Sequence, residues 1–230
     1  MKLLLENWRE YITEDWRDTS WKNDEDEVTI GEVVGYLGDK TVDINVLKLS
    51  QQLPPLPTRG AERVAEDVVQ AYRERVNRIQ RDVNLIPPEA RPRTALIEWI
   101  EPVMVAGNWM PELLRLAGGR GPDFQSAEKS HFTTWDSIGA FDPDVVIFCP
   151  CGFDLQRTKD EIQTMQNPGF LSLRAAHKGS VYAVDGNAYF NRSGPRLVDS
   201  LAILAHLLHP QQISPPALTS SANAAWSRLY

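Results

Sequence analysis

Apolar residues recur every three or four positions from Thr58 to Val83, which is the longest periodic pattern in the chain. They fall on one face of a helix, and charged residues fall mostly on the other face. At a rise of about 1.5 Å per residue such a helix is about 35–40 Å long. The pattern therefore predicts a helix that crosses a domain or joins two. Its apolar positions are Val64, Val68, Ala71, Tyr72, Val76, Ile79 and Val83.

From Arg93 onward the pattern alternates between short apolar runs and amphipathic stretches. Such alternation predicts a parallel sheet with helices on both faces, so the expected fold class is α/β with a three-layer lobe. Strands are predicted at 94–99, 144–149 and 181–184. Helices are predicted at 110–117, 134–140, 154–166 and 196–209, with residues 171–177 extending the third helix or forming a separate turn.

The first 57 residues are too few to hold a core of their own. They are acidic and rich in tryptophan, with a short helix expected around Trp8 and Tyr11, another at 28–37 and a strand at 43–49. Pro54, Pro55 and Pro57 then interrupt the chain before the long helix. The predicted organisation is a reduced amino-terminal segment at 1–57, a long connecting helix at 58–88, an α/β ligand-binding lobe at 89–210 and a flexible tail at 211–230.

Composition excludes several classes of protein. The chain has 230 residues, of which 42% are hydrophobic and 24% charged, as in globular proteins. A net charge of -7 without any basic run argues against a nucleic-acid surface. There is no run of 18 apolar residues that would span a membrane. The three apolar residues near Met1 are too few for a signal peptide, so the chain as written is expected to be cytoplasmic, or the mature form of an exported protein.

Cysteine and histidine give weak signals for metal or thiol chemistry. Cys149 and Cys151 are too close for a structural disulfide and have no second pair to complete a zinc site. His206 and His209 have a spacing compatible with a metal, although histidines near a helix end are more often surface charge. A Cys151 nucleophile would need a base and an orienting group, which the sequence does not identify.

Three loops combine glycine with aromatic residues, and each follows a predicted parallel strand. Such loops share the carboxyl edge of the sheet, where open α/β folds bind ligands. Their aromatic and guanidinium groups suit a large flat ligand with amide or carboxylate edges. Trp99, at the end of a strand, is expected to belong to the core. The displayed residues are expected to be Trp109, Phe153, Tyr189, Phe190 and Arg192.

Five motifs in order over about residues 58–210 resemble the carboxyl-terminal lobe of cobalamin-binding, periplasmic-type substrate-binding proteins of ABC importers. They are Glu98-Trp-Ile-Glu-Pro102 with Val105-Ala-Gly-Asn-Trp109, Pro111-Glu-Leu-Leu-Arg-Leu-Ala-Gly-Gly119, Asp142-Pro-Asp-Val-Val146, Pro150-Cys-Gly-Phe-Asp-Leu155 with Arg157-Thr158, and Val184-Asp-Gly-Asn-Ala-Tyr-Phe-Asn-Arg-Ser-Gly-Pro-Arg196.

The resemblance implies two α/β lobes joined by one long helix, with the ligand held between the lobes. It also implies a non-enzymatic protein that binds cobalamin as a ligand, uses no catalytic cofactor, and delivers the ligand to an ABC permease outside the cytoplasm. The residues carried over as ligand contacts are Trp109, Phe153, Tyr189, Phe190 and Arg192. This chain departs from the family in its first 57 residues, which do not match a full amino-terminal lobe.

Three other functions stay open from the sequence. The chain could be a remodelled relative that binds no corrinoid and acts as a protein-interaction module through its acidic, tryptophan-rich start. It could bind an iron-siderophore or haem, as related members of the wider class do. The third is a thiol enzyme that uses Cys151.

Overall fold

The computed structural model describes the backbone of residues 58–125, 129–192, 194–218 and 224–229, and within these ranges the side chains from residue 67 onward. The chain divides into two compact units, Met1–Val69 and Gln70–Tyr230. The elements predicted between residues 1 and 57 lie outside the described residues. The second unit contains the whole sheet and the candidate site.

Six strands form one mixed sheet in the order β3-β2-β1-β4-β5-β6. The three central strands are parallel to each other, and the pairs β1–β2, β2–β3 and β5–β6 are antiparallel. The central strand is buried along its whole length, as expected for a continuous apolar run covered on both faces. The strands are β1 (Thr94–Trp99), β2 (Met104–Val105), β3 (His131–Phe132), β4 (Val145–Phe148), β5 (Val181–Val184) and β6 (Trp226–Arg228).

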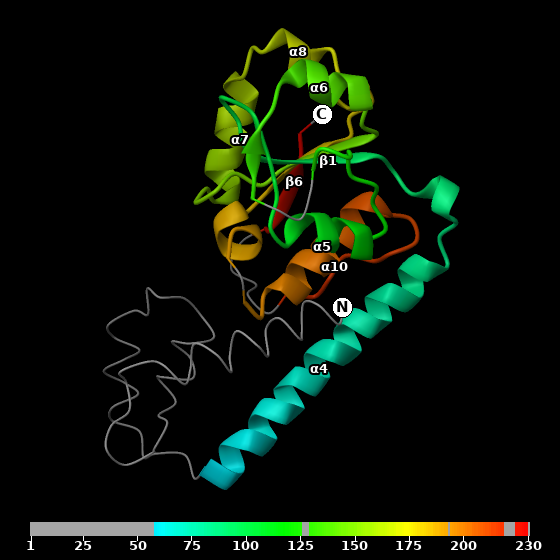
Figure 1. The fold of residues 1–230 in the computed structure, drawn as a ribbon, viewed down its shortest axis with the longest axis vertical. Helices are drawn as coiled ribbons and strands as arrows, with labels where there is room; N and C mark the ends of the chain where they lie inside the picture. Colours follow the sequence, from blue (N-terminus) through cyan, green and yellow to red (C-terminus); the bar gives the residue numbers. More distant parts are fainter. Residues whose placement is uncertain (1–57, 126–128, 193, 219–223, 230) are drawn as a thin grey trace. The chain divides into compact units, whose positions relative to one another are not determined.

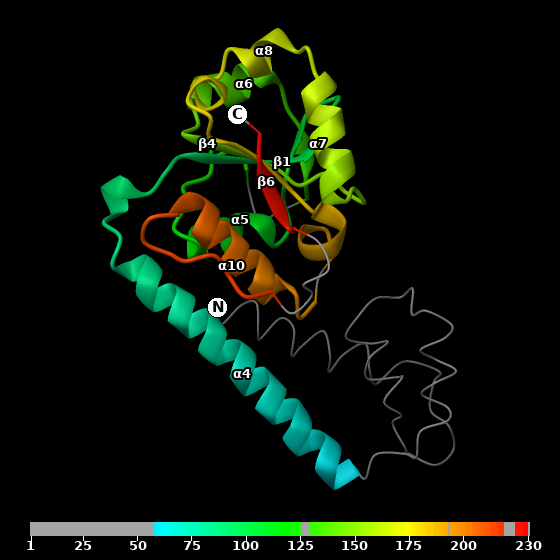
Figure 2. The ribbon, with the colours of Figure 1, turned by 180° about the vertical axis from the view of Figure 1, so that it is seen from behind.

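Helices cover both faces of the sheet, so the predicted α/β class with three layers is confirmed (Figures 1 and 2). One face carries α5 (Met110–Leu116) and α10 (Leu197–Leu208), which pack against each other. The other face carries α6 (Trp135–Phe141), α7 (Leu155–Thr164), α8 (Pro168–Leu171) and α9 (Arg174–His177). The helices begin close to the predicted positions because Thr134 and Asp154 cap them, each accepting a hydrogen bond from the backbone N–H three residues later.

Aromatic side chains fill the layer between the sheet and α6–α9. The ring centroids of Trp135, Phe148 and Phe170 lie 5.3 to 6.3 Å apart, and all three residues are buried. Tilted and edge-to-face contacts of this kind stabilise a core beyond the area that they bury. The three residues come from α6, β4 and α8, so their contacts join two helices to the central strand.

The antiparallel strands at the sheet edges were not predicted. β2, β3 and β6 are two or three residues long, which is too short to show a period of two in the sequence. The prediction of a flexible tail at 211–230 is therefore wrong for residues 226–228, which pair with β5 in the register Ala183↔Ser227. The tail is rich in Pro, Ser, Ala and Gln, a composition typical of coil, and its strand forms by pairing with β5.

The long helix α4 spans Thr58–Asn84, in agreement with the predicted helix. Its apolar stripe is buried progressively, from half-buried Val76 and Ile79 to buried Val83. Polar side chains of the same face hold α10 and α5, since Arg75 Nη2 lies 2.5 Å from Asp199 Oδ1 and Gln80 donates to the carbonyl of Leu116. The turn η1 (Pro88–Ala90) then leads to β1.

His209 is the residue that follows the last turn of α10, and its side chain is buried. It is 4% exposed, and a Cβ placed on Gly118 would collide with its Nε2. Burial lowers the pKa of His209 below its usual value, and its buried Nε2 has no hydrogen-bond partner among the described residues. Protonation therefore favours the unfolded chain, whose imidazole gains a proton first as the pH falls.

We expect the free energy of unfolding to decrease as the pH falls below about 6.5 and to level off below the pKa of folded His209. Urea unfolding between pH 5 and 8, with His209→Gln beside wild type, measures this effect. The variant should lose that part of the pH dependence, whereas His177→Gln, at an exposed histidine, should keep it. Equal pH slopes in wild type and His209→Gln would contradict the assignment.

Candidate functional site

The loops after β1, β4 and β5 meet at one edge of the sheet, because these three strands are parallel and adjacent. Backbone hydrogen bonds connect the loops directly. Cys151 N donates to Glu98 O at 3.1 Å, and Asn187 N donates to Phe153 O at 2.9 Å. The sequence predicts the site at this edge, and the structure brings the three loops together there.

Phe153 contacts an indole and a guanidinium. The ring of half-buried Trp99 meets it edge-on at a centroid distance of 5.4 Å, and Arg157 Cζ lies 3.6 Å from the centroid of the Phe153 ring. Phe153 itself is buried. Trp99 is partly exposed rather than enclosed in the core, and its Nε1 donates to Glu101 O at 3.1 Å. The indole of Trp99 and the guanidinium of Arg157 reach solvent here, and Arg157 Nε also lies 3.8 Å from Glu161 Oε1 in an exposed ion pair that water screens.

The loop after β5 forms a single π-helical turn, η2 (Gly186–Phe190). Asp185 caps it by accepting from Ala188 N at 2.8 Å, and Ser200 Oγ of α10 donates to Tyr189 O. Isolated π turns occur often at functional sites. The turn directs Tyr189 and Phe190 inward, so both side chains are buried rather than displayed as the sequence analysis expected.

Trp109 and Arg192 remain accessible at this edge. Trp109 is half-buried, and its Nε1 donates to Phe190 O at 3.1 Å. Arg192 is exposed and donates from Nη2 to Asn187 Oδ1 at 3.1 Å. Of the five predicted contact residues, these two are open to a ligand in this structure.

Two arginines at this edge were not among the predicted site residues. Arg157 lies in the first turn of α7, and Arg196 precedes α10 and donates to Ala188 O at 3.3 Å. Both are exposed. Their signal in the sequence was their position shortly after a candidate loop, at the start of the following helix. With Arg192 they place three guanidinium groups on the loops and helix starts of one sheet edge.

The two cysteines differ in accessibility. Cys149 is buried and Cys151 is exposed. Burial, followed by the charge of Glu98, raises the pKa of each thiol, for Cys149 well above its usual value. Because the thiolate is the nucleophile, a raised pKa disfavours the thiol-enzyme interpretation. Among the described residues no three His, Cys, Asp or Glu side chains gather as metal ligands.

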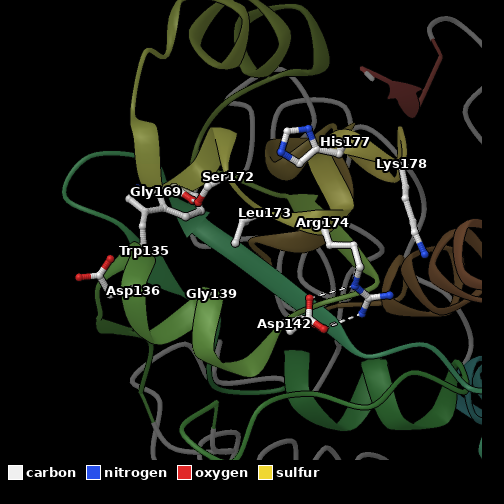
Figure 3. A pocket seen from close by; sticks show the side chains of 10 residues that line it. All are labelled: Trp135, Asp136, Gly139, Asp142, Gly169, Ser172, Leu173, Arg174, His177 and Lys178. Atoms are coloured by element: carbon white, nitrogen blue, oxygen red, sulfur yellow. Dashed lines mark hydrogen bonds and ion pairs between the residues drawn. The ribbon is translucent and has the colours of Figure 1, made fainter.

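A separate groove of about 580 Å³ lies between α6 and α8–α9 (Figure 3). Arg174 Nε lies 2.9 Å from Asp142 Oδ1, and Arg174 Nη2 lies 2.8 Å from Asp144 Oδ1. Arg174 and Arg93 lower the pKa of Asp142, so the carboxylate stays ionised. These charges are already paired, which indicates that they join α6, β4 and α9 rather than bind a ligand.

None of the described helices is long and apolar enough to cross a membrane.

No protein-family profile matches the chain, and no curated protein matches it. Solved structures do match. A periplasmic binding protein from Veillonella parvula is 22% identical with a TM-score of 0.54, and the match covers 67% of this chain and 53% of that protein. A periplasmic haem-binding protein from Pseudomonas aeruginosa is 23% identical with a TM-score of 0.54, covering 69% and 57%.

The triscatecholate siderophore-binding protein FeuA from Bacillus subtilis, complexed with ferri-bacillibactin, is 17% identical with a TM-score of 0.53, covering 67% and 56%. The matches therefore extend over little more than half of each of these three proteins. All three are binding proteins by name rather than enzymes. Over the matched part, the chain has the fold of periplasmic solute-binding proteins.

Proposed function

We propose that the chain binds a metal chelate at the carboxyl edge of its sheet, as the substrate-binding component of an ABC importer does. The observation that carries the proposal is that three exposed arginines, Arg157, Arg192 and Arg196, come from the loops and helix starts of the sheet edge that also bears the half-buried indoles of Trp99 and Trp109. Indoles offer flat apolar faces, and guanidiniums pair with carboxylate or catecholate oxygens. An ABC permease is the partner that this function implies.

Charge favours an anionic chelate over cobalamin. Haem carries two propionate groups and a ferric tris-catecholate carries a net negative charge, so both would be attracted to the three guanidiniums. The edge amides of a corrinoid would gain less from them. Two of the matching structures are, by name, a haem-binding protein and a siderophore-binding protein with its ferric ligand. Cobalamin remains the second candidate, supported by the five sequence motifs.

One lobe alone covers only part of such a ligand. Closed pockets bury about 70–90% of a ligand's surface, and a single sheet edge covers less. We therefore propose micromolar affinity for this chain, which corresponds to about −8 kcal/mol. The acidic amino-terminal segment lies outside the described residues.

Titration of the purified chain with haem or a ferric tris-catecholate should shift the absorption spectrum with a Kd of about 1–10 μM. Arg192→Gln and Arg157→Gln should each weaken binding about tenfold, since a charge-assisted hydrogen bond contributes about 1.5–3 kcal/mol. Arg115→Gln, which removes an exposed arginine of α5, is the matched control and should bind like wild type.

The ligand series decides between the candidates. Binding of cyanocobalamin alone, unaffected by the arginine substitutions, would favour the corrinoid interpretation over the anionic chelate. The absence of any spectral shift at about 100 μM for all three ligands, an affinity weaker than about −5.5 kcal/mol, would reject the proposed function altogether.

A further inference from the structure

The side chain of Asn191 joins the loop after β4 to the loop after β5. Its Nδ2 donates to Cys149 O at 3.0 Å, and its Oδ1 accepts from Gly152 N at 3.3 Å. Its own backbone N–H donates to Gly186 O at 2.9 Å and closes the π turn. One half-buried amide therefore bonds both ends of the turn Cys149–Gly152 while its backbone closes η2.

The loops after β4 and β5 pack tightly against each other at Gly186. A Cβ added to Gly186 would lie closer than 3.0 Å to Pro150 O and to Asn191 Oδ1. A backbone hydrogen bond from Asn187 N to Phe153 O, 2.9 Å long, makes a second link nearby. Close packing of this kind holds a loop in one position only if the polar groups at the contact are paired.

Only an amide of this length meets both requirements. Cys149 O needs a donor and Gly152 N needs an acceptor, and asparagine supplies one of each. Aspartate keeps the acceptor for Gly152 but sets a carboxylate oxygen against Cys149 O. Alanine leaves both backbone groups without a protein partner.

We propose that Asn191 is a positioning residue of the ligand site, which fixes the loop of Phe153 and Arg157 relative to the loop of Arg192. This inference rests on the proposed function, because the two loops carry its ligand contacts. Asn191 acts through the backbone of the loops and is not itself proposed to touch the ligand.

Buried Cys149 reports the position of the loops without any ligand. In a Cys151→Ser background, where Cys149 is the remaining thiol, Asn191→Ala should increase the rate of native-state reaction with a thiol reagent about tenfold. Asn191→Asp should increase it as well, despite its equal size. Asn187→Ala is the matched control, since the side chain of this exposed asparagine of the same loop bonds Arg192 and not the loop after β4, and it should leave the rate unchanged.

Haem affinity and global unfolding by urea complete the test. Asn191→Ala should weaken haem binding about tenfold. Its effect on the equilibrium constant of global unfolding should be smaller than its effect on the rate of Cys149 modification. Three outcomes would overturn the proposal. The first is an unchanged rate of Cys149 modification, and the second is an increased rate with unchanged haem affinity. The third is a loss of global stability large enough to account for the whole increase in rate. If wild type binds no chelate, the proposed function fails, and the thiol rates alone then decide whether Asn191 holds the loops.

Discussion

Replacing Phe190 by alanine is expected to lower the free energy of unfolding by about 3–5 kcal/mol. Phe190 is 1% exposed and belongs to the largest fully buried side chains among the described residues. It ends the π turn η2, which packs on α10. Truncation removes the transfer free energy of the ring and leaves a cavity that the rigid surroundings fill only in part. Urea unfolding monitored by circular dichroism measures the loss.

Phe132 is the matched control for this substitution, since the same ring on edge strand β3 is 63% exposed. Phe132→Ala should change the free energy of unfolding by less than about 0.5 kcal/mol, as surface substitutions usually do. Equal stability of Phe190→Ala and wild type would show that the ring does not belong to the core. The residue pattern of the loop predicts instead a ring displayed toward a ligand.

That difference shows what the sequence can reveal about a loop. The order of residues from Val184 to Arg196 identified a strand end, a turn and a following helix, and all three are present. Whether an aromatic ring in such a turn points outward depends on the turn type. In a π turn the backbone hydrogen bond spans one residue more than in an α-helix, so the side chains that follow are rotated relative to α-helical positions. No local pattern in the five residues of η2 specifies this turn.

The central strands were predictable because each is an apolar run of several residues, and the longer helices because their apolar period repeats over several turns. β1 and β5 have the predicted bounds, and α4, α7 and α10 begin within one residue of the predicted positions. The edge strands were not predictable because each pairs through two or three residues, whose conformation is set by the neighbouring strand. For the same reason β6 was not predicted, since it lies in a tail whose composition is typical of coil.

The location of the candidate site was predictable from topology, but its chemistry was only partly so. Parallel strands bring their carboxyl ends together whatever their side chains, so three loops could be assigned to one edge. Arg157 and Arg196 stand within the quoted motifs but were not chosen as ligand contacts, because they occupy the positions where the following helices begin. Asn191 stands within one of the five motifs, but its contacts with Cys149 and Gly152 join positions about 40 residues apart, which the sequence does not reveal.

Arg75→Met is expected to lower the free energy of unfolding by about 3 kcal/mol, the lower end of the range for breaking a buried ion pair. Asp199 is 2% exposed on α10, and its Oδ1 lies 2.5 Å from Arg75 Nη2. The side chain of Arg75 is 30% exposed, so water at its position offsets part of the loss. The carboxylate that remains keeps its burial but loses its guanidinium partner.

A double-mutant cycle with Asp199→Asn isolates the interaction of this pair. The double variant should be more stable than the sum of the two single losses predicts, because an amide without the arginine leaves no buried charge. Arg115→Met, in an exposed arginine whose Nη2 lies 4.0 Å from Glu112 on α5, is the control and should cost less than about 0.5 kcal/mol. Additive losses in the cycle would show that Arg75 and Asp199 act independently. Since Ser200, the next residue of α10, holds the Tyr189 carbonyl of η2, a coupled pair would also tie α4 to the helix that supports the site.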